Sequence, residues 1–424
     1  MTIRRPASRR FISKLAMVAA MAGMGATMAV VPATPAFAKK EKEAKPQYSK
    51  EFIEAYKPYE AAAKAETPDV AAQQAALPQI IALASSPDEK LVAGQAAINV
   101  GGANKDMATQ YKGTQLMLES GKLPPESVGQ VNYAAGQLAY NLKDFAAAQN
   151  YLRTAIDGGY AAEEGPLILA ETYFQQKDIN GGLNYLNGMI EARKAAGQPI
   201  QEDWLSRGFS MAYNNKLNDQ ALKWATLRAT EFPSKDSWGN AIALAINTND
   251  YDKPAMLDLL RLARRTDTLR NGNMYMEYAD AADARKLPQE VVTLLDAGTK
   301  AGVISGDTAL VQEWRKQAAT RLAADKGDLP GLVRDANASG AKLVTVMAAA
   351  DTLLSYGRSA EAEGLYAKAL PMAGAMAPTV LTRMGIAQID QGKYGEAETT
   401  FERVDGARQT IANLWALYAT QQAS

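Results

Sequence analysis

Two stretches of the chain decide its fold: they read GQLAYNLKDFAAAQNYLRTAI at residues 136–156 and AETYFQQKDINGGLNYLNGMI at residues 170–190. The two align with a constant step of 34 residues, which places Lys143 over Lys177. A repeat of this length is typical of a helix-turn-helix unit, which buries its apolar face only by stacking on further copies of itself. The sequence therefore predicts an all-α fold, a right-handed solenoid of antiparallel helix pairs.

The same pattern continues along the chain. A third unit covers residues 204–233, and its Lys216 lies 39 residues after the matching lysine of the second unit, because a loop around residues 197–199 adds five residues. A surface loop tolerates such an insertion, whereas a packed helix does not. Near the C-terminus the pattern returns at a step of 35, with Gly357 aligned to Gly392. The repeat pattern is thus present in the middle of the chain and again near its C-terminus.

Breaks in helical spacing and shifts in composition divide the chain into six segments. The segments are a signal peptide at 1–38, a charged linker at 39–47, N-terminal helical pairs at 48–128, the clearest repeats at 129–252, divergent helical repeats at 253–342, and C-terminal repeats with a capping helix at 343–424. Within the third segment, helix breaks are expected at Pro68, Pro87, Gly101-Gly102 and Pro124-Pro125.

The N-terminus has the pattern of an export signal. Five basic residues among the first 14 precede an uncharged run over residues 15–31, and Ala36-Phe37-Ala38 fits the small-residue cleavage rule. We expect cleavage after Ala38 and a mature protein that is periplasmic or secreted. An uncleaved anchor is the alternative, and both the general and the twin-arginine export routes stay open. No later run is apolar enough to span a bilayer, so no membrane insertion is expected after cleavage.

Composition limits the chemistry of the mature chain. Without the signal, 41 basic residues stand against 46 acidic ones, a net charge of −5, so nucleic-acid binding has little electrostatic support. The chain has no cysteine and no histidine, which removes disulfides, thiolate nucleophiles, the commonest metal ligand and every Ser-His-Asp arrangement. We expect no metal site, no cofactor and no nucleic-acid partner.

Short catalytic motifs in the sequence lack the partners they need. The Gly208-Phe209-Ser210 stretch resembles a nucleophile elbow, but no histidine exists to activate the serine and the segment is expected to be helical. A glycosidase requires only two carboxylates. A helical-toroid enzyme acting on glycans with a carboxylate pair is therefore an alternative, in which the five tryptophans would line a sugar cleft. Those tryptophans are Trp204, Trp224, Trp238, Trp314 and Trp415.

At this point the repeats resemble the tetratricopeptide repeat (TPR) family, whose pattern places W-x2-L-G-x2-Y on a first helix, A-x3-F on a second, and a terminating proline. The matching residues are Leu381, Met384, Gly385, Ala397 and Phe401 in the last unit, Tyr173 in the second and Pro233 in the third. Most units lack the opening tryptophan, and the centre of the chain departs widely from the pattern. The resemblance implies a non-enzymatic protein that binds peptides or partner proteins in a concave groove lined by first helices.

Carrying this groove over places similar side chains at matching positions of three units. The predicted groove residues are Gln137, Tyr140 and Asn141, then Glu171, Phe174 and Gln175, then Ser210, Tyr213 and Asn214. Aromatic rings offer rigid apolar area and amides both donate and accept hydrogen bonds, so such a ladder suits an extended peptide. The alternative is that the three aromatic residues pack between helices.

These observations predict an exported, non-enzymatic scaffold or adaptor for a protein or peptide whose identity the sequence does not give. A homo-oligomeric structural component of the cell envelope is a further alternative. It rests on the last helix, whose apolar face either closes the solenoid or contacts a second copy. The residues of that face are Leu414, Trp415, Leu417 and Tyr418.

Overall fold

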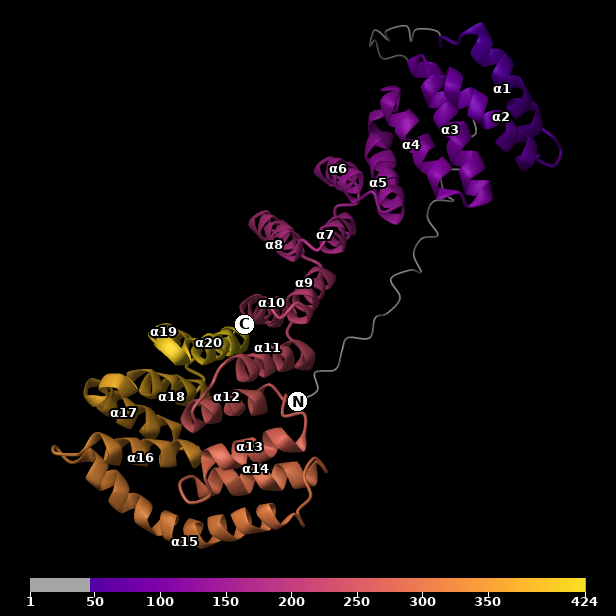
Figure 1. Ribbon diagram of the computed structural model, residues 1–424. Helices are drawn as coiled ribbons and strands as arrows, with labels where there is room; N and C mark the ends of the chain where they lie inside the picture. Colours follow the sequence, from indigo (N-terminus) through magenta and orange to yellow (C-terminus); the bar gives the residue numbers. More distant parts are fainter. Residues whose placement is uncertain (1–45, 424) are drawn as a thin grey trace, which may run out of the picture. The chain divides into compact units, whose positions relative to one another are not determined.

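The computed structural model describes residues 46–423, so the predicted signal peptide and most of the predicted linker lie outside the described part of the chain. Every regular element in residues 46–423 is helical. Within residues 50–195 and within residues 218–423, each α-helix contacts the next one along the chain, and the helices are arranged as antiparallel pairs (Figure 1). The predicted all-α, TPR-like solenoid of helix pairs is therefore confirmed. No helix in this range is long and apolar enough to cross a membrane.

The helices form two compact units, divided between Trp204 and Leu205. Unit 1 contains α1 (Lys50–Ala63), α2 (Val70–Leu83), α3 (Pro87–Asn104), α4 (Met107–Glu119), α5 (Pro125–Asn141), α6 (Phe145–Asp157), α7 (Gly165–Gln175) and α8 (Ile179–Ala195). The division falls inside α9 (Glu202–Asn214), most of which belongs to unit 2.

Unit 2 continues with eleven further α-helices. They are α10 (Asn218–Glu231), α11 (Lys235–Thr248), α12 (Lys253–Arg265), α13 (Gly272–Ala282), α14 (Pro288–Lys300), α15 (Ala309–Asn337), α16 (Leu343–Ser355), α17 (Ser359–Ala369), α18 (Ala377–Asp390), α19 (Tyr394–Glu402) and α20 (Gln409–Ala423). A short 3-10 turn, η4 (Gly406–Arg408), precedes α20. The segment predicted to hold divergent helical repeats, residues 253–342, contains α12 to α15.

The repeated Lys-Asp pair forms the corner between the two helices of a hairpin. Lys143 after α5 and Lys177 after α7 have φ values of 65° and 63°, in the left-handed region. The following Asp144 and Asp178 each accept a hydrogen bond from the backbone N–H three residues further on, and so cap the second helix. The Lys-Asp pair at residues 105–106 makes the same corner before α4. The lysine ends the first helix and the aspartate begins the second. The Lys-Asp pair therefore recurs at the 34-residue step of the repeat.

The first prediction concerns this corner. A lysine in the left-handed region is strained by its Cβ, so Lys143→Gly should raise the free energy of unfolding by about 0.5–1 kcal/mol. Asp144→Ala removes the cap and should lower it by about 1 kcal/mol. Urea unfolding followed by circular dichroism measures both changes. A Lys143→Gly variant less stable than the wild type would show that the lysine side chain itself stabilises the corner.

The expected helix break at residues 101–102 is wrong, because α3 continues through both glycines. A Cβ on Gly101 would lie 2.7 Å from both Cγ and the backbone N of Gln110 in α4. Gly94 and Gly113 make a similar approach, since a Cβ on either would lie 2.7 Å from the carbonyl oxygen of the other. These glycines allow α3 and α4 to cross closely, and they do so at some cost in helix propensity.

The first helix of unit 1 is tied to α3 by one buried carboxylate. Glu89 is 1% exposed and accepts 2.7 Å hydrogen bonds from both the backbone N–H and the hydroxyl of Ser49. It also accepts bonds from Ser85 and from the backbone N–H of Ser86, at 2.8–3.0 Å. Burial raises the pKa of Glu89, but these donors outweigh it and hold the pKa well below its usual range.

Unit 2 closes on itself. Its early helix α12 contacts α18 and α20, and α11 contacts α20 (Figure 1). Gln421 of α20 joins the two ends: its Nε2 donates to the carbonyl of Ala229 at 2.8 Å, and its Oε1 accepts from the indole N–H of Trp238 at 3.1 Å. Stacked hairpins require contacts only between neighbours. The closure is therefore an additional feature that the repeat pattern does not predict.

The apolar face of the last helix is buried in this closure. Leu414 and Trp415 are 1% and 0% exposed, and Leu417 and Tyr418 are half-buried. Trp415 stacks on Phe401 of α19, with ring centroids 6.3 Å apart. Within unit 2 this face packs against α19 and α12, and its roles as a cap or as a contact with a second copy stay predictions.

Candidate functional site

The predicted groove residues of unit 1 lie in two very different environments. Asn141 and Gln175 are exposed, whereas Gln137, Tyr140 and Glu171 are half-buried. Phe174 is only 6% exposed and lies directly against α8, since a Cβ on Gly182 would be 2.2 Å from its ring. The ring centroids of Tyr140 and Phe145 are 5.7 Å apart. Phe174 is thus a packing residue, as the alternative interpretation of the aromatic ladder expects, while the amides remain accessible.

The predicted groove residues of unit 2 are more open. Tyr213 is 39% exposed at the end of α9, and Asn214 beside it is also exposed. Ser210, one turn earlier, is half-buried. The ring of Tyr213 stacks on Phe209 at a centroid distance of 5.9 Å, which fixes its orientation. Because these three residues belong to unit 2 and the other six to unit 1, a single continuous ladder stays a prediction.

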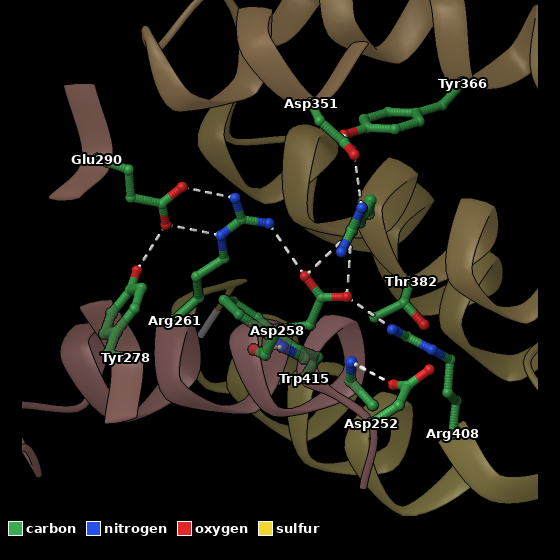
Figure 2. A network of polar contacts seen from close by, with 12 residues as sticks. Asp252, Asp258, Arg261, Tyr278, Glu290, Asp351, Tyr366, Thr382, Arg408 and Trp415 are labelled. Atoms are coloured by element: carbon green, nitrogen blue, oxygen red, sulfur yellow. Dashed lines mark hydrogen bonds and ion pairs between the residues drawn. The ribbon is translucent and has the colours of Figure 1, made fainter. Parts of the chain in front are cut away.

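A second concentration of functional groups lies in unit 2, around a carboxylate that the repeat pattern does not mark (Figure 2). Asp258 of α12 is completely buried. Its carboxylate accepts from Arg261 at 3.0 Å, from Arg383 of α18 at 3.2 Å and from Arg408 of η4 at 2.8 Å. Arg383 and Arg408 lie 125 and 150 residues after Asp258 in the sequence. One carboxylate thus joins three arginines from the beginning and the end of unit 2.

Two further carboxylates complete the network (Figure 2). Glu290 of α14 accepts from Nε and Nη2 of Arg261 at 2.8 and 2.6 Å, a bidentate pair, and from the Tyr278 hydroxyl at 2.7 Å. Asp351 of α16 accepts from Arg383 at 2.6 Å, and its other oxygen accepts from the Tyr366 hydroxyl. Three carboxylates therefore balance three arginines, which is the condition under which buried charges are tolerated.

The ionised state of this network follows from its contacts. Burial raises the pKa of Asp258, but Arg383, Arg408 and Arg261 outweigh burial and lower it below its usual range. At Glu290, Arg261 and the Tyr278 hydroxyl likewise outweigh the effect of burial and lower the pKa. Burial and the neighbouring carboxylate raise the pKa of Tyr278 well above its ordinary value. Both carboxylates are hence charged acceptors, and neither is a protonated acid available for catalysis.

A signal for the burial of α12 is present in its sequence. Residues 257–263 read LDLLRLA, and all seven are buried over nearly two turns. A helix that is apolar on every side belongs in an interior. The aspartate and arginine within it must then be buried and paired.

A cavity of about 740 Å³ lies beside the network, within unit 2. Helices α12, α13, α14, α15, α16 and α18 all contribute to its wall. The lining residues are Arg261, Arg264, Arg265, Tyr278, Gln289, Glu290, Thr293, Lys326, Leu354, Ser355, Tyr356, Gly357, Ile386 and Asp390. The volume is that of a typical small-molecule site. Four of these residues are cationic and two are anionic.

The tryptophans do not form the sugar cleft that a glycan-active enzyme would use. Four of the five are buried, with exposed fractions between 0% and 5%, and Trp314 is half-buried. The carboxylates that line the cavity, Glu290 and Asp390, are each paired with an arginine. Within residues 46–423, no group of three or more metal-binding side chains is arranged to hold a metal ion.

Comparisons with known proteins add only a distant likeness of fold. No protein-family model matches the chain, and no curated protein matches it significantly. Among 61 matching chains of solved structures, one from the Naa15/Naa10 complex bound to HypK-THB is 14% identical over 85% of this chain, with a TM-score of 0.38. This chain spans 58% of that protein's length.

Two further solved structures show the same level of likeness. A chain of the APC/C hetero-tetramer Cut9-Hcn1 is 14% identical over 78% of this chain and 67% of its own length, with a TM-score of 0.24. A monomeric mutant of IFIT1 with m7Gppp-AAAA is 15% identical over 78% of this chain and 76% of its own, with a TM-score of 0.22. Likenesses this distant do not indicate what this chain binds. The class of protein is defined by its helix pairs alone.

Proposed function

We propose that this protein is an exported, non-enzymatic scaffold that binds a peptide or a partner protein through the first helices of its repeats. The observation that carries the proposal is the exposed end of α9, where Tyr213 stands 39% exposed next to the exposed amide of Asn214. A rigid aromatic ring beside an amide supplies apolar contact area and hydrogen bonds to a peptide backbone. The export signal is proposed from residues 1–38 of the sequence.

The accessible amides of unit 1 support the same function. Asn141 and Gln175 end α5 and α7 at matching positions, and both are exposed. We propose that they contact the partner together with Gln137, Tyr140 and Glu171, which are half-buried, and with Ser210 of α9. Phe174 supports this surface from within, because it fixes α7 against α8.

The second prediction tests this surface in the cells that produce the protein. A photoreactive phenylalanine analogue at Tyr213 or at Asn141 should crosslink a reproducible partner, identified by mass spectrometry. The same analogue at Lys223, an exposed residue of the second helix α10, should not. Tyr213→Ala combined with Asn214→Ala should abolish the capture and lower the free energy of unfolding by about 1 kcal/mol or less, through the lost ring stacking.

Three outcomes of this experiment would count against the proposal. Equal adducts from Tyr213 and Lys223 would remove the assignment to first helices. Adducts made only with a second copy of the chain would favour the homo-oligomeric envelope component. Stabilisation of the protein by oligosaccharides, with no protein adduct at either position, would favour a glycan-active enzyme.

A further inference from the structure

Two cations that line the cavity of unit 2 have no anionic partner. Arg264 of α12 and Lys326 of α15 both contribute to its wall, and both are exposed side chains. Neither forms an ion pair or a side-chain hydrogen bond with any residue in the described range 46–423. Two helices far apart in sequence therefore present unpaired positive charge to the same partly open cavity.

The other charges of the wall are already compensated. Arg261 is held by Asp258 and Glu290. Arg265 pairs with Asp390, whose second oxygen accepts from the Ser359 hydroxyl at 3.0 Å.

One further carboxylate lies near the cavity, that of Asp325, next to Lys326 in the chain. It accepts a long hydrogen bond of 3.4 Å from the hydroxyl of Tyr356. Even when Asp325 is counted, the cations around the cavity exceed the anions. This local excess contrasts with the mildly acidic composition expected for the mature chain.

Part of the wall is held in place by contacts within the protein. The bidentate Arg261–Glu290 pair and the Tyr278 hydroxyl hold one side of the cavity. The guanidinium of Arg265 lies 5.8 Å from the ring centroid of Trp415. A site with groups already ordered loses less conformational entropy when it binds. Apolar contact area is supplied by Leu354 and Ile386.

We propose that this cavity binds a small ligand that carries a carboxylate or phosphate group, held between Arg264 and Lys326. Charge-assisted hydrogen bonds from an arginine and a lysine are the usual way in which proteins recognise either anion. The volume of about 740 Å³ admits a molecule of metabolite size. This site is separate from the proposed partner surface, so each can fail without the other.

The third prediction is tested by isothermal titration calorimetry of the purified protein at low ionic strength. Citrate and inorganic phosphate are the two probes, and a neutral sugar is the blank. Arg264→Gln combined with Lys326→Gln should weaken binding by about tenfold or more, because the variant loses both charge-assisted hydrogen bonds to the anion. The matched control, Lys223→Gln combined with Lys300→Gln, removes two charges from exposed positions of α10 and α14 and should bind as the wild type does.

The relative affinities separate the two chemistries. Tighter binding of citrate indicates a carboxylate ligand, and tighter binding of phosphate indicates a phosphorylated one. Asp325→Asn should leave binding unchanged or strengthen it, since the neighbouring negative charge is removed. The proposal is overturned if neither probe binds saturably, or if the cavity variant and the surface control lose affinity equally. Circular dichroism of all variants confirms that the exposed substitutions leave the fold intact.

Discussion

Replacement of Asp258 by asparagine should lower the free energy of unfolding by about 3–5 kcal/mol, the usual cost of leaving buried charges without their partner. Asp258 is completely buried and accepts from three arginines, of which Arg383 and Arg408 belong to the other end of unit 2. An asparagine retains the shape of the side chain but no longer compensates the guanidinium groups. We therefore expect the closure of unit 2 to open before its hairpins unfold.

Hydrogen exchange measured by mass spectrometry distinguishes opening of the closure from global unfolding. Amides of α12, α18 and α20 should exchange faster in the Asp258→Asn variant, and those of α5 to α8 in unit 1 should not change. The matched control is Asp280→Asn, which removes the same charge from an exposed ion pair with Lys253 and should cost about 1 kcal/mol or less. Equal protection in both variants would mean that Asp258 does not hold the closure.

The pH dependence of stability follows from the same carboxylate. Its folded-state pKa lies below the unfolded value of about 3.9, so the stability it contributes is present above that value and is lost as the pH falls through the folded pKa. The difference in urea midpoint between wild type and Asp258→Asn should therefore be largest near neutral pH and shrink below about pH 4. A constant difference down to pH 3 would show that the carboxylate charge is not what stabilises unit 2.

The local structure of this chain could be predicted from the sequence because its causes are local. The Lys-Asp corner ends one helix and caps the next within two residues, so it recurs wherever a hairpin turns. The same reasoning wrongly predicted a helix break at the two glycines, residues 101–102. Glycine weakens a helix but also permits close crossing, and only the position of α4 decides which effect matters.

The closure of unit 2 could not be predicted because its partners lie far apart in the chain. Arg383 and Arg408 occur in helical segments where charged residues ordinarily face water. Nothing in their local spacing connects them with an aspartate more than a hundred residues earlier. The buried sequence LDLLRLA at 257–263 did contain a sign that its charges needed partners, although not which partners. Because the cavity depends on that closure, the sequence also does not indicate which cations line it.

Replacement of Trp415 by alanine should likewise lower the free energy of unfolding by about 3–5 kcal/mol. Its ring is completely buried and stacks on Phe401, and its indole N–H donates to the carbonyl of Asp258 at 3.0 Å. The alanine variant loses the packing of a large ring at the point where α20 meets α12. Urea unfolding followed by circular dichroism measures the loss, and Leu310→Ala, at a side chain 42% exposed, should change stability by about 0.5 kcal/mol or less.

Trp415→Phe separates the two contributions of this side chain. A phenylalanine retains most of the apolar contact with Phe401 but not the hydrogen bond to α12, which is worth about 1 kcal/mol. If α20 were only a cap on α19, the loss of that bond would leave hydrogen exchange in α12 unchanged. If α20 closes unit 2, as its contacts indicate, faster exchange in α12 should accompany even this small change.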